Sequence, residues 1–327
     1  MSTIEILRNF RVFNHFTDSL VADLVDLSTS VSYKKGEHLY SCGDPSTKLY
    51  LLLKGAVRLE KASHYGPLVF AHVLPGDLAG EVGYVDGKEH GADAVAETDA
   101  EVLAFDIEPL KAATAESPAF ALSVSWSVWK SLSGNLRKAN NRLAGFFGKQ
   151  AEPPADEVPL PELRERDPFR IGMDAKRALF REQQLSALEI NLLSSMSTEL
   201  KFEPGQTVFG EDDIADALYV VLSGSVMINK YIPGAGEEAL AFLSRGDYFG
   251  EMALIDQESR SAGAKAHDEG ATVLSIPSDV ILGLLDINKV SSIRLLRLFC
   301  QMVAQRLRES DEKLYGWFLL SAGQSPS

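Results

Sequence analysis

Short apolar runs separated by glycines dominate two stretches of the chain, and both stretches follow one pattern. YKKGEHLYSCGDPSTKLYLLLKGAVRL begins at Tyr33, and FEPGQTVFGEDDIADALYVVLSGSVMI begins at Phe202. When the two are aligned, Tyr50 matches Tyr219. Runs of this length, rich in Leu, Val and Tyr and ended by glycine, predict short strands joined by tight turns. A single duplication of such strands indicates two domains rather than a solenoid.

Helical patterns frame each predicted set of strands. An amphipathic segment from Asp18 to about Leu27 precedes the first set, and a segment after Ser186 precedes the second. The second segment begins with SALE, in which Ser186 and Glu189 can cap each other's backbone amides. Long helical patterns then follow both sets of strands.

The two long helical patterns carry seam positions at alternating steps of four and three residues. The first begins with the N-cap pair Ser117-Pro118 and carries Leu122, Trp126, Trp129, Ser133, Leu136, Asn140, Leu143 and Phe147. The second is expected to begin at Ser275-Ile276-Pro277 and carries Ile293, Leu296, Cys300, Val303, Leu307, Ser310, Leu314 and Trp317. Each seam either covers its own strands or forms a homodimer interface, in which Asn140 would fix the register.

These elements predict an α+β protein with two consecutive β-roll (jelly-roll-like) domains, each flanked by helices. The first domain is expected over residues 1–147 and the second over residues 171–320. Residues 148–170 contain GKQAEPPADEVPLPELRERDP, which is rich in proline and acidic residues. Such a composition is typical of a semi-extended linker.

Composition and charge disfavour several classes of protein. The 327 residues carry a formal net charge of −14, which disfavours nucleic acid as a partner. The chain stops at Ser327, shortly after the last helical pattern, and a helix-turn-helix DNA reader is not expected. Cys42 and Cys300 are far apart, and no clustered metal ligands are found. We see no signal peptide and no run of about 18 apolar residues, so a soluble cytoplasmic protein without a membrane span is expected.

Each copy contains one loop with unusual chemistry: GDLAGEVGYVDGKEHGADAVA over residues 76–96, and GDYFGEMALIDQESRSAGAKA over residues 246–266. In the second loop, Gly250 allows the backbone to approach a ligand closely. A helical turn from Glu251 can present free amides to an anion, and the Arg260 guanidinium can bind a phosphate bidentately. Glu251 can accept hydrogen bonds from a sugar hydroxyl. The loop therefore combines a phosphate clamp with a ribose acceptor.

FGEMAL followed by RSA resembles the phosphate-binding cassette of the cyclic nucleotide-binding domain family. That family includes the catabolite activator protein, the regulatory subunits of cyclic-AMP-dependent kinase and cyclic-nucleotide-gated channels. The resemblance covers nearly all of both copies, and it implies that Glu251 takes the ribose 2′-hydroxyl while Arg260 pairs with the cyclic phosphate. The expected ligand-binding residues are Phe249, Gly250, Glu251, Met252, Ala253, Arg260, Ser261 and Ala262. We call residues 76–96 the first cassette and residues 246–266 the second cassette.

The first cassette departs from the family pattern. Gly80 and Glu81 match the glycine and glutamate expected at the ribose end of the second cassette, but His90 occupies the position of Arg260. A neutral imidazole is a poor phosphate partner, and the nearby Asp93 adds negative charge. The first cassette is therefore interpreted as a degenerate site that no longer binds. The alternative is a pH-sensitive site or a site for another ligand.

These observations predict a receptor for a cyclic mononucleotide, cAMP or cGMP, that regulates an effector protein through a ligand-induced conformational change. The chain shows no nucleophile elbow, paired metal ligands or Walker loop, so we expect no enzyme and no cofactor or metal. One alternative is a non-binding scaffold in which Glu251 and Arg260 form an internal ion pair. A metal-dependent jelly-roll oxygenase is a third possibility. Neither the choice of base nor the partner follows from the sequence.

Overall fold

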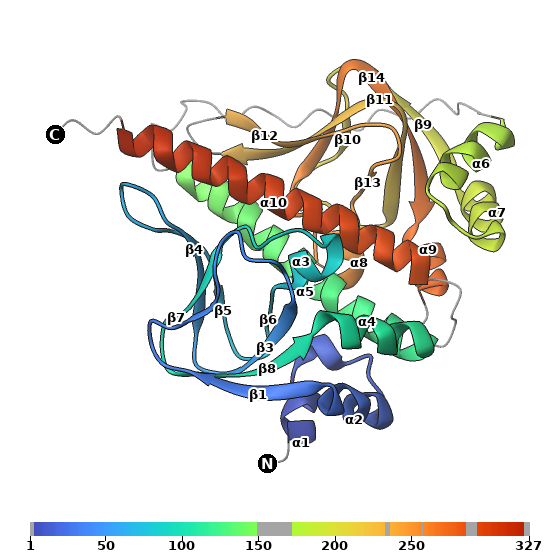
Figure 1. The fold of residues 1–327 in the computed structure, drawn as a ribbon. Helices are drawn as coiled ribbons and strands as arrows, with labels where there is room; N and C mark the ends of the chain where they lie inside the picture. Colours follow the sequence, from blue (N-terminus) through green and yellow to red (C-terminus); the bar gives the residue numbers. More distant parts are fainter. Residues whose placement is uncertain (1–2, 149–171, 233–235, 257, 286–292, 324–327) are drawn as a thin grey trace. The chain divides into compact units, whose positions relative to one another are not determined.

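The structure is a computed structural model that describes residues 3–148, 172–232, 236–256, 258–285 and 293–323 (Figure 1). Contacts between residues divide the chain into two compact units. Unit 1 consists of residues 1–139 and 296–327, and unit 2 consists of residues 140–295. Each unit contains one of the two sequence copies together with part of the long helix that follows the other copy.

The first copy folds into a roll of two four-stranded antiparallel sheets within unit 1. Their orders are β1-β8-β3-β6 and β2-β7-β4-β5. The strands are β1 (Ser28–Tyr33), β2 (His38–Tyr40), β3 (Lys48–Lys54), β4 (Val57–Lys61), β5 (Leu68–Val73), β6 (Leu78–Ala79), β7 (Asp93–Ala96) and β8 (Ala100–Asp106).

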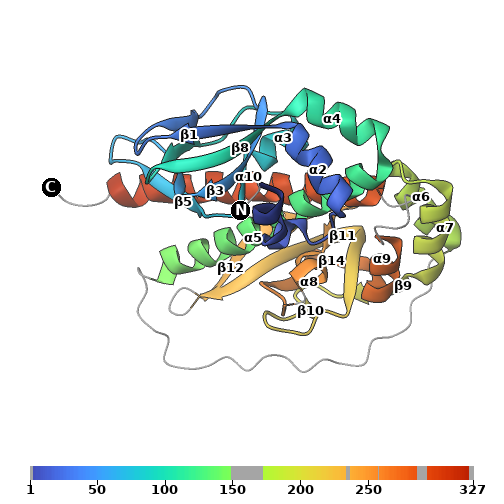
Figure 2. The ribbon, with the colours of Figure 1, turned by 90° about the horizontal axis from the view of Figure 1, so that it is seen from below.

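The second copy forms the equivalent roll in unit 2, with two long strands in place of four short ones. β11 and β14 pair along most of their length, with register shifts where the roll bends, for example between Val221 and Ser223. The strands are β9 (Thr198–Phe202), β10 (Thr207–Phe209), β11 (Ala217–Ile232), β12 (Gly236–Leu243), β13 (Tyr248–Phe249) and β14 (Gly263–Pro277). The pairing of β12 with β11 is visible from below (Figure 2).

Short helices stand beside both rolls. Those of unit 1 are α1 (Thr3–Arg8), the 3-10 turn η1 (Arg11–Phe13), α2 (Asp18–Asp26), α3 (Glu81–Asp86) and α4 (Ile107–Glu116). Those of unit 2 are α6 (Met173–Glu182), α7 (Ala187–Met196), α8 (Met252–Asp256) and α9 (Ser278–Leu284). Two predicted features are confirmed: α2 begins at Asp18, and the capping box of Ser186 and Glu189 opens α7.

The two long helices are α5 (Pro118–Gly148) and α10 (Ile293–Gly323). α5 begins at Pro118 as predicted, and the Ser117 hydroxyl accepts a hydrogen bond from the Phe120 amide at 3.3 Å. The predicted helix start at residues 275–277 is wrong in one respect, because Ser275 belongs to β14 and pairs with Tyr219. Pro277 is the N-cap of the short helix α9, and the long helix begins only at Ile293.

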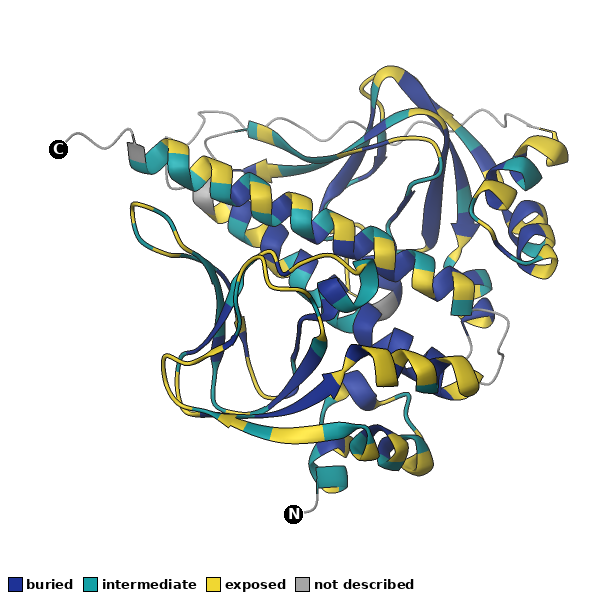
Figure 3. Ribbon diagram, viewed as in Figure 1, coloured by how far each residue is buried: buried dark blue, intermediate teal, exposed yellow. Residues whose placement is uncertain are grey.

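The described positions of the first seam are buried, as are those of the second from Leu296 to Leu314. Figure 3 shows buried and exposed stretches alternating along α10. Within unit 1, the Trp129 ring packs on Phe299 with centroids 5.2 Å apart, and Cys300 Sγ lies 3.5 Å from the Ser125 carbonyl oxygen. The seam of α5 in unit 1 is thus covered by α10. Asn140 is also buried, and Phe147 lies among residues whose side chains are not described.

The predicted domain limits separate the two rolls, whereas the contacts assign residues 296–327 to the unit of the first roll. The limits 1–147 and 171–320 therefore remain a prediction about the sequence modules. Residues 149–170 of the predicted linker lie outside the described residues.

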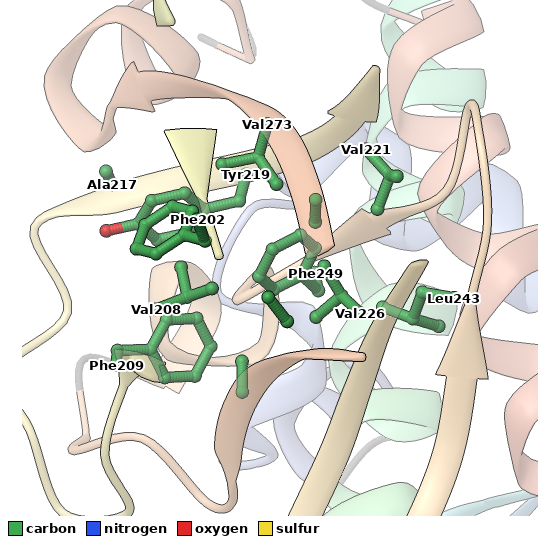
Figure 4. Packing of buried hydrophobic residues seen from close by; sticks show 13 residues of the cluster. Phe202, Val208, Phe209, Ala217, Tyr219, Val221, Val226, Leu243, Phe249 and Val273 are labelled. Atoms are coloured by element: carbon green, nitrogen blue, oxygen red, sulfur yellow. The ribbon is translucent and has the colours of Figure 1, made fainter. Parts of the chain in front are cut away.

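An apolar core fills each roll. In the second roll, thirteen buried residues form one cluster, with Phe202, Phe209, Tyr219 and Phe249 among the aromatic members (Figure 4). The first roll has an equivalent cluster, in which Ala79 stands at the position of Phe249. The two cores hold their cassettes at the same place on the roll.

Candidate functional site

A left-handed glycine sets the geometry of the second cassette. Gly250 follows β13 and has a φ of +82°. A Cβ at this position would lie 2.5 Å from Arg260 Nη1, so a larger residue would be both strained and in collision. Phe249 is fully buried and stacks on Tyr219, with ring centroids 5.3 Å apart. The aromatic anchor and the glycine together place Glu251 and α8 beside Arg260.

Arg260 is almost entirely buried, with a relative exposure of 2%. Its Nη1 donates to the Gly250 carbonyl oxygen and its Nη2 to the Ala217 carbonyl oxygen, both at 2.7 Å. The guanidinium carbon lies 4.4 Å from the centroid of the Phe209 ring, a cation–π arrangement. These contacts fix the orientation of the guanidinium plane inside the cassette.

Among the described residues, Arg260 Nε has no hydrogen-bond partner. A buried guanidinium N–H without an acceptor costs free energy, and an anion at this position would supply the acceptor. Burial lowers the pKa of Arg260 from its ordinary value, while Tyr219, Asp216 and Glu251 act in the opposite direction. An arginine remains protonated in proteins, so the cassette holds a permanent positive charge.

The other predicted ligand-binding residues gather around this arginine. Glu251 is buried, with a relative exposure of 3%, and its charge acts on Arg260. The Ser261 hydroxyl contacts the Met252 sulfur at 3.7 Å, and Ala253 and Ala262 are buried. The structure thus brings the eight predicted residues into one cassette. Their roles toward a ligand remain a proposal.

The first cassette repeats this backbone. Gly80 has a φ of +84°, and Glu81 follows it with a relative exposure of 3%. The His90 amide donates to the Asp44 carbonyl oxygen at 3.0 Å, just as the Arg260 amide donates to Asp213. The two loops therefore share their main-chain shape.

The Glu81 carboxylate is already engaged by helix α5. Asn135 Nδ2 donates to Glu81 Oε1 at 2.7 Å, and the Ser131 hydroxyl lies 3.5 Å from the same oxygen. Burial raises the pKa of Glu81 to about 7, despite the hydrogen bonds from Asn135 and Ser131. One oxygen of the carboxylate that aligns with the predicted ribose acceptor thus already accepts a hydrogen bond from an amide of the protein itself.

His90 is buried and stacks on Tyr40, with ring centroids 3.7 Å apart and an angle of 10° between the ring planes. Burial lowers the pKa of His90, Arg308 lowers it further, and Asp44 opposes both. The neutral imidazole is therefore favoured at pH 7. In place of a permanent cation, the first cassette has an uncharged aromatic ring.

One detail expected of the first cassette is different in the structure. The Asp93 carboxylate accepts a hydrogen bond from the Cys42 amide at 2.9 Å and lies 3.9 Å from His38 Nδ1. The carboxylate whose charge acts on His90 is Asp44. Asp93 supports the turn at Cys42 because its side chain satisfies a backbone amide there.

Several residues at the two cassettes were not predicted. Aligning the repeats would have found Phe209 and Tyr40, which occupy matching positions beneath Arg260 and His90. Polar spacing of four residues on α5 is the only sequence signal for Ser131 and Asn135. No local pattern marks Arg308, whose guanidinium pairs with Asp86 at 2.5 Å within unit 1.

The comparisons with known proteins agree with this geometry. A family model described as "Cyclic nucleotide-binding domain" matches residues 30–117 and again residues 199–288, which together exceed half of the chain. The chain therefore belongs to the cyclic nucleotide-binding domain family and carries two copies of the domain. The predicted family and the α+β class with two β-rolls are confirmed.

Two curated relatives illustrate the range of similar proteins. The Cyclic AMP receptor protein of Thermus thermophilus is 33% identical over 134 residues, which are 40% of this chain and 58% of that protein. The cAMP-dependent protein kinase regulatory subunit of Emericella nidulans is 33% identical over 111 residues, 31% of this chain and 26% of that protein. The chain therefore spans less than two thirds of either relative.

Among solved structures, the regulatory domain of Toxoplasma gondii PKA with cAMP is 18% identical. The match covers 90% of this chain and 92% of that chain, with a TM-score of 0.32. A cyclic nucleotide-binding domain from Methylobacillus flagellatus is 24% identical over 44% of this chain and 81% of that chain, with a TM-score of 0.40.

Two further features bear on other classes of function. Within the described ranges, no helix combines the length and the apolar character needed to cross a bilayer. The same part of the chain holds no group of three or more His, Cys, Asp or Glu side chains arranged to bind a metal ion.

Proposed function

We propose that the chain is a receptor for a cyclic mononucleotide, cAMP or cGMP, bound in the second cassette. The observation that carries the proposal is the state of Arg260: buried, held by two carbonyl oxygens and a ring, and left with an unpaired Nε–H. A cyclic phosphate is a compact anion that matches this donor. The names of the relatives, which include a cyclic AMP receptor protein, support the same ligand class.

Binding would use the two charged side chains for different parts of the ligand. Arg260 Nε would donate to a phosphate oxygen, while its Nη atoms keep the guanidinium oriented through Gly250 and Ala217. The Glu251 carboxylate would accept from the ribose 2′-hydroxyl. Because Arg260 is already held in place, little side-chain entropy would be lost on binding.

The first cassette would serve as a support rather than as a second receptor site. Its glutamate is engaged by Asn135, and His90 carries no permanent charge. The ligand would therefore bind once per chain. Occupation of the second cassette would shift the protein between conformations and so alter the surface that an effector protein reads. On this proposal the chain regulates and does not catalyse.

A homodimer through a long helix also stays a prediction. Trp126 and Trp129 are buried in unit 1, so an interface would use other residues. Light scattering at increasing protein concentration measures the oligomeric state, and a constant monomer mass would contradict the dimer.

Isothermal titration of the full chain with cAMP, cGMP and cyclic dinucleotides tests the receptor directly. We expect one cyclic mononucleotide per chain and a rise in melting temperature with ligand concentration. A ligand at 100 times its dissociation constant stabilises the binding-competent state by about 2.7 kcal/mol. Unchanged melting temperatures at millimolar concentrations of every cyclic nucleotide would favour the non-binding scaffold.

A further inference from the structure

Two lysines at matching positions of the repeats, Lys61 and Lys230, each contact a long helix. In unit 1, Lys61 Nζ lies 4.6 Å from the centroid of the Tyr315 ring, and the Tyr315 hydroxyl donates to the Ala62 carbonyl oxygen at 2.8 Å. In unit 2, Lys230 Nζ donates to Asn141 Oδ1 at 3.1 Å. In both units the helix belongs, in sequence, to the other copy. The matching lysines thus contact a long helix in both units, but through partners of different chemistry.

Only Lys230 also reaches a cassette. Its Nζ donates to Glu211 Oε1 at 2.5 Å and to the Ser261 carbonyl oxygen at 3.1 Å. The Lys230 side chain is 11% exposed, so these bonds are largely shielded from solvent. Ser261 directly follows Arg260. Lys230 thus holds the main chain next to the proposed phosphate ligand.

We propose that Lys230 is a positioning residue of the second cassette, and that through Asn141 it makes nucleotide affinity depend on helix α5. This inference rests on the proposed function. Lys230 supplies three donors, and Asn141, Glu211 and the Ser261 carbonyl take them. When Asn141 holds one donor, the ammonium group and the Ser261 carbonyl are fixed in the arrangement that orients Arg260.

Helix α5 can carry this dependence because it is continuous from Pro118 to Gly148. Within unit 1 it engages Glu81 through Asn135, and within unit 2 it engages Lys230 through Asn141. Coupling between two sites is reciprocal: if α5 strengthens ligand binding, ligand binding strengthens the attachment of α5 by the same factor. The helix after the first roll would in this way respond to a ligand in the second.

The test compares Asn141→Ala, Lys230→Gln and Lys230→Arg in the full chain, with Lys61→Gln as the matched control. Asn141 is exposed, so its truncation leaves the fold intact. Titration with cAMP and cGMP should show affinity about three- to tenfold weaker for Asn141→Ala, as for loss of one hydrogen bond. Lys230→Gln should lose at least as much, Lys230→Arg should recover most of it, and Lys61→Gln should match the wild type.

Hydrogen exchange provides a second readout that needs no ligand. Asn141→Ala should speed exchange of backbone amides over residues 259–266, and bound nucleotide should slow exchange in residues 131–143 of the wild type. Unchanged affinity in Asn141→Ala, or equal losses in Lys61→Gln and Lys230→Gln, would overturn the inference. If the wild type binds no cyclic nucleotide, the proposed function fails. The positioning role is then decided by exchange over residues 259–266 alone, and unchanged rates there reject it.

Discussion

The two cassettes have the same backbone and different chemistry. Gly80 and Gly250 have φ angles of +84° and +82°, and in both cassettes the following glutamate is buried. Yet position 260 carries an arginine on the Phe209 ring, whereas position 90 carries a histidine on the Tyr40 ring. Glycine conformations and main-chain hydrogen bonds maintain the loop, so the loop persists where a histidine takes the place of the buried arginine.

Glu81 shows how the protein satisfies the buried carboxylate of the first cassette. Glu81 receives a hydrogen bond from Asn135, and its burial raises its pKa to about 7. An amide donor stabilises a carboxylate less than a full positive charge does. In the first cassette, side chains of the protein itself thus donate hydrogen bonds to the buried carboxylate. In the second cassette, the Arg260 Nε–H has no hydrogen-bond acceptor among the described residues.

The largest effect is expected from Arg260→Leu. A charge-assisted hydrogen bond contributes about 1.5–3 kcal/mol, so loss of the Arg260 Nε–H donor should weaken cyclic nucleotide binding by about tenfold to more than a hundredfold. Titration calorimetry measures the change. His90→Ala, at the matching position, should leave both affinity and a stoichiometry of one unaltered. Two equal sites per chain, or binding that survives Arg260→Leu and disappears in His90→Ala, would reverse the assignment of the two cassettes.

A stability difference between pH 5 and pH 8 should come from Glu81. Below about pH 4.5 its carboxyl is protonated in both the folded and the unfolded protein, so it does not affect stability. As the pH rises toward 7, the unfolded chain releases this proton first, which favours unfolding. Above pH 7 the loss is complete, at about 3 kcal/mol.

Glu81→Gln removes this titration and should therefore be more stable than the wild type at pH 8 but not at pH 5. Denaturant unfolding of both proteins across this pH range measures the difference. A wild type whose stability relative to Glu81→Gln does not change with pH would show that Glu81 titrates near its ordinary value.

A smaller effect is expected from Glu251→Gln, because the amide oxygen can still accept one hydrogen bond. Cyclic nucleotide affinity should fall about tenfold, the loss of a charge-assisted bond. Glu81→Gln should leave affinity unchanged at pH 7, which makes it the matched control. Equal losses in the two variants would mean that both cassettes hold a ribose.

The smallest effect is expected from His90→Arg, which restores the cation alone. Asn135 still engages Glu81, and the Arg308 charge already acts on position 90. We therefore expect the titration to remain at one nucleotide per chain. A second site created by this one substitution would show that the missing cation is the sole defect of the first cassette.

Local signals in the sequence predicted much of this structure. The repeat located both rolls, and Ser186 and Glu189 marked the start of α7. The roles of the cassette residues, inferred from one motif, remain a prediction. These features depend on neighbours within a few residues. By contrast, Ser275 was misread as a helix start because a proline two positions later suggests one, although β14 continues to Pro277.

Contacts between distant segments could not be predicted in the same way. The residues around Asn135 give no sign of its hydrogen bond to Glu81, and the residues around Lys230 give no sign of its hydrogen bond to Asn141. The α10 seam was recognised, but not that α10 would cover Trp129 of α5. Such pairings depend on which segments the tertiary fold brings together. An apolar helix face of this pattern could pack against any of several other apolar faces.

Unit 1 is discontinuous in the chain, and this affects how the protein is made. Residues up to 139 leave the ribosome well before Leu296, where the part of α10 that belongs to this unit and covers Trp129 begins. At about 5–20 residues per second, translation of the intervening segment takes roughly ten to thirty seconds. Throughout that time Trp129 of α5 lacks its cover from α10, because the segment that completes the first unit follows the second roll in the chain.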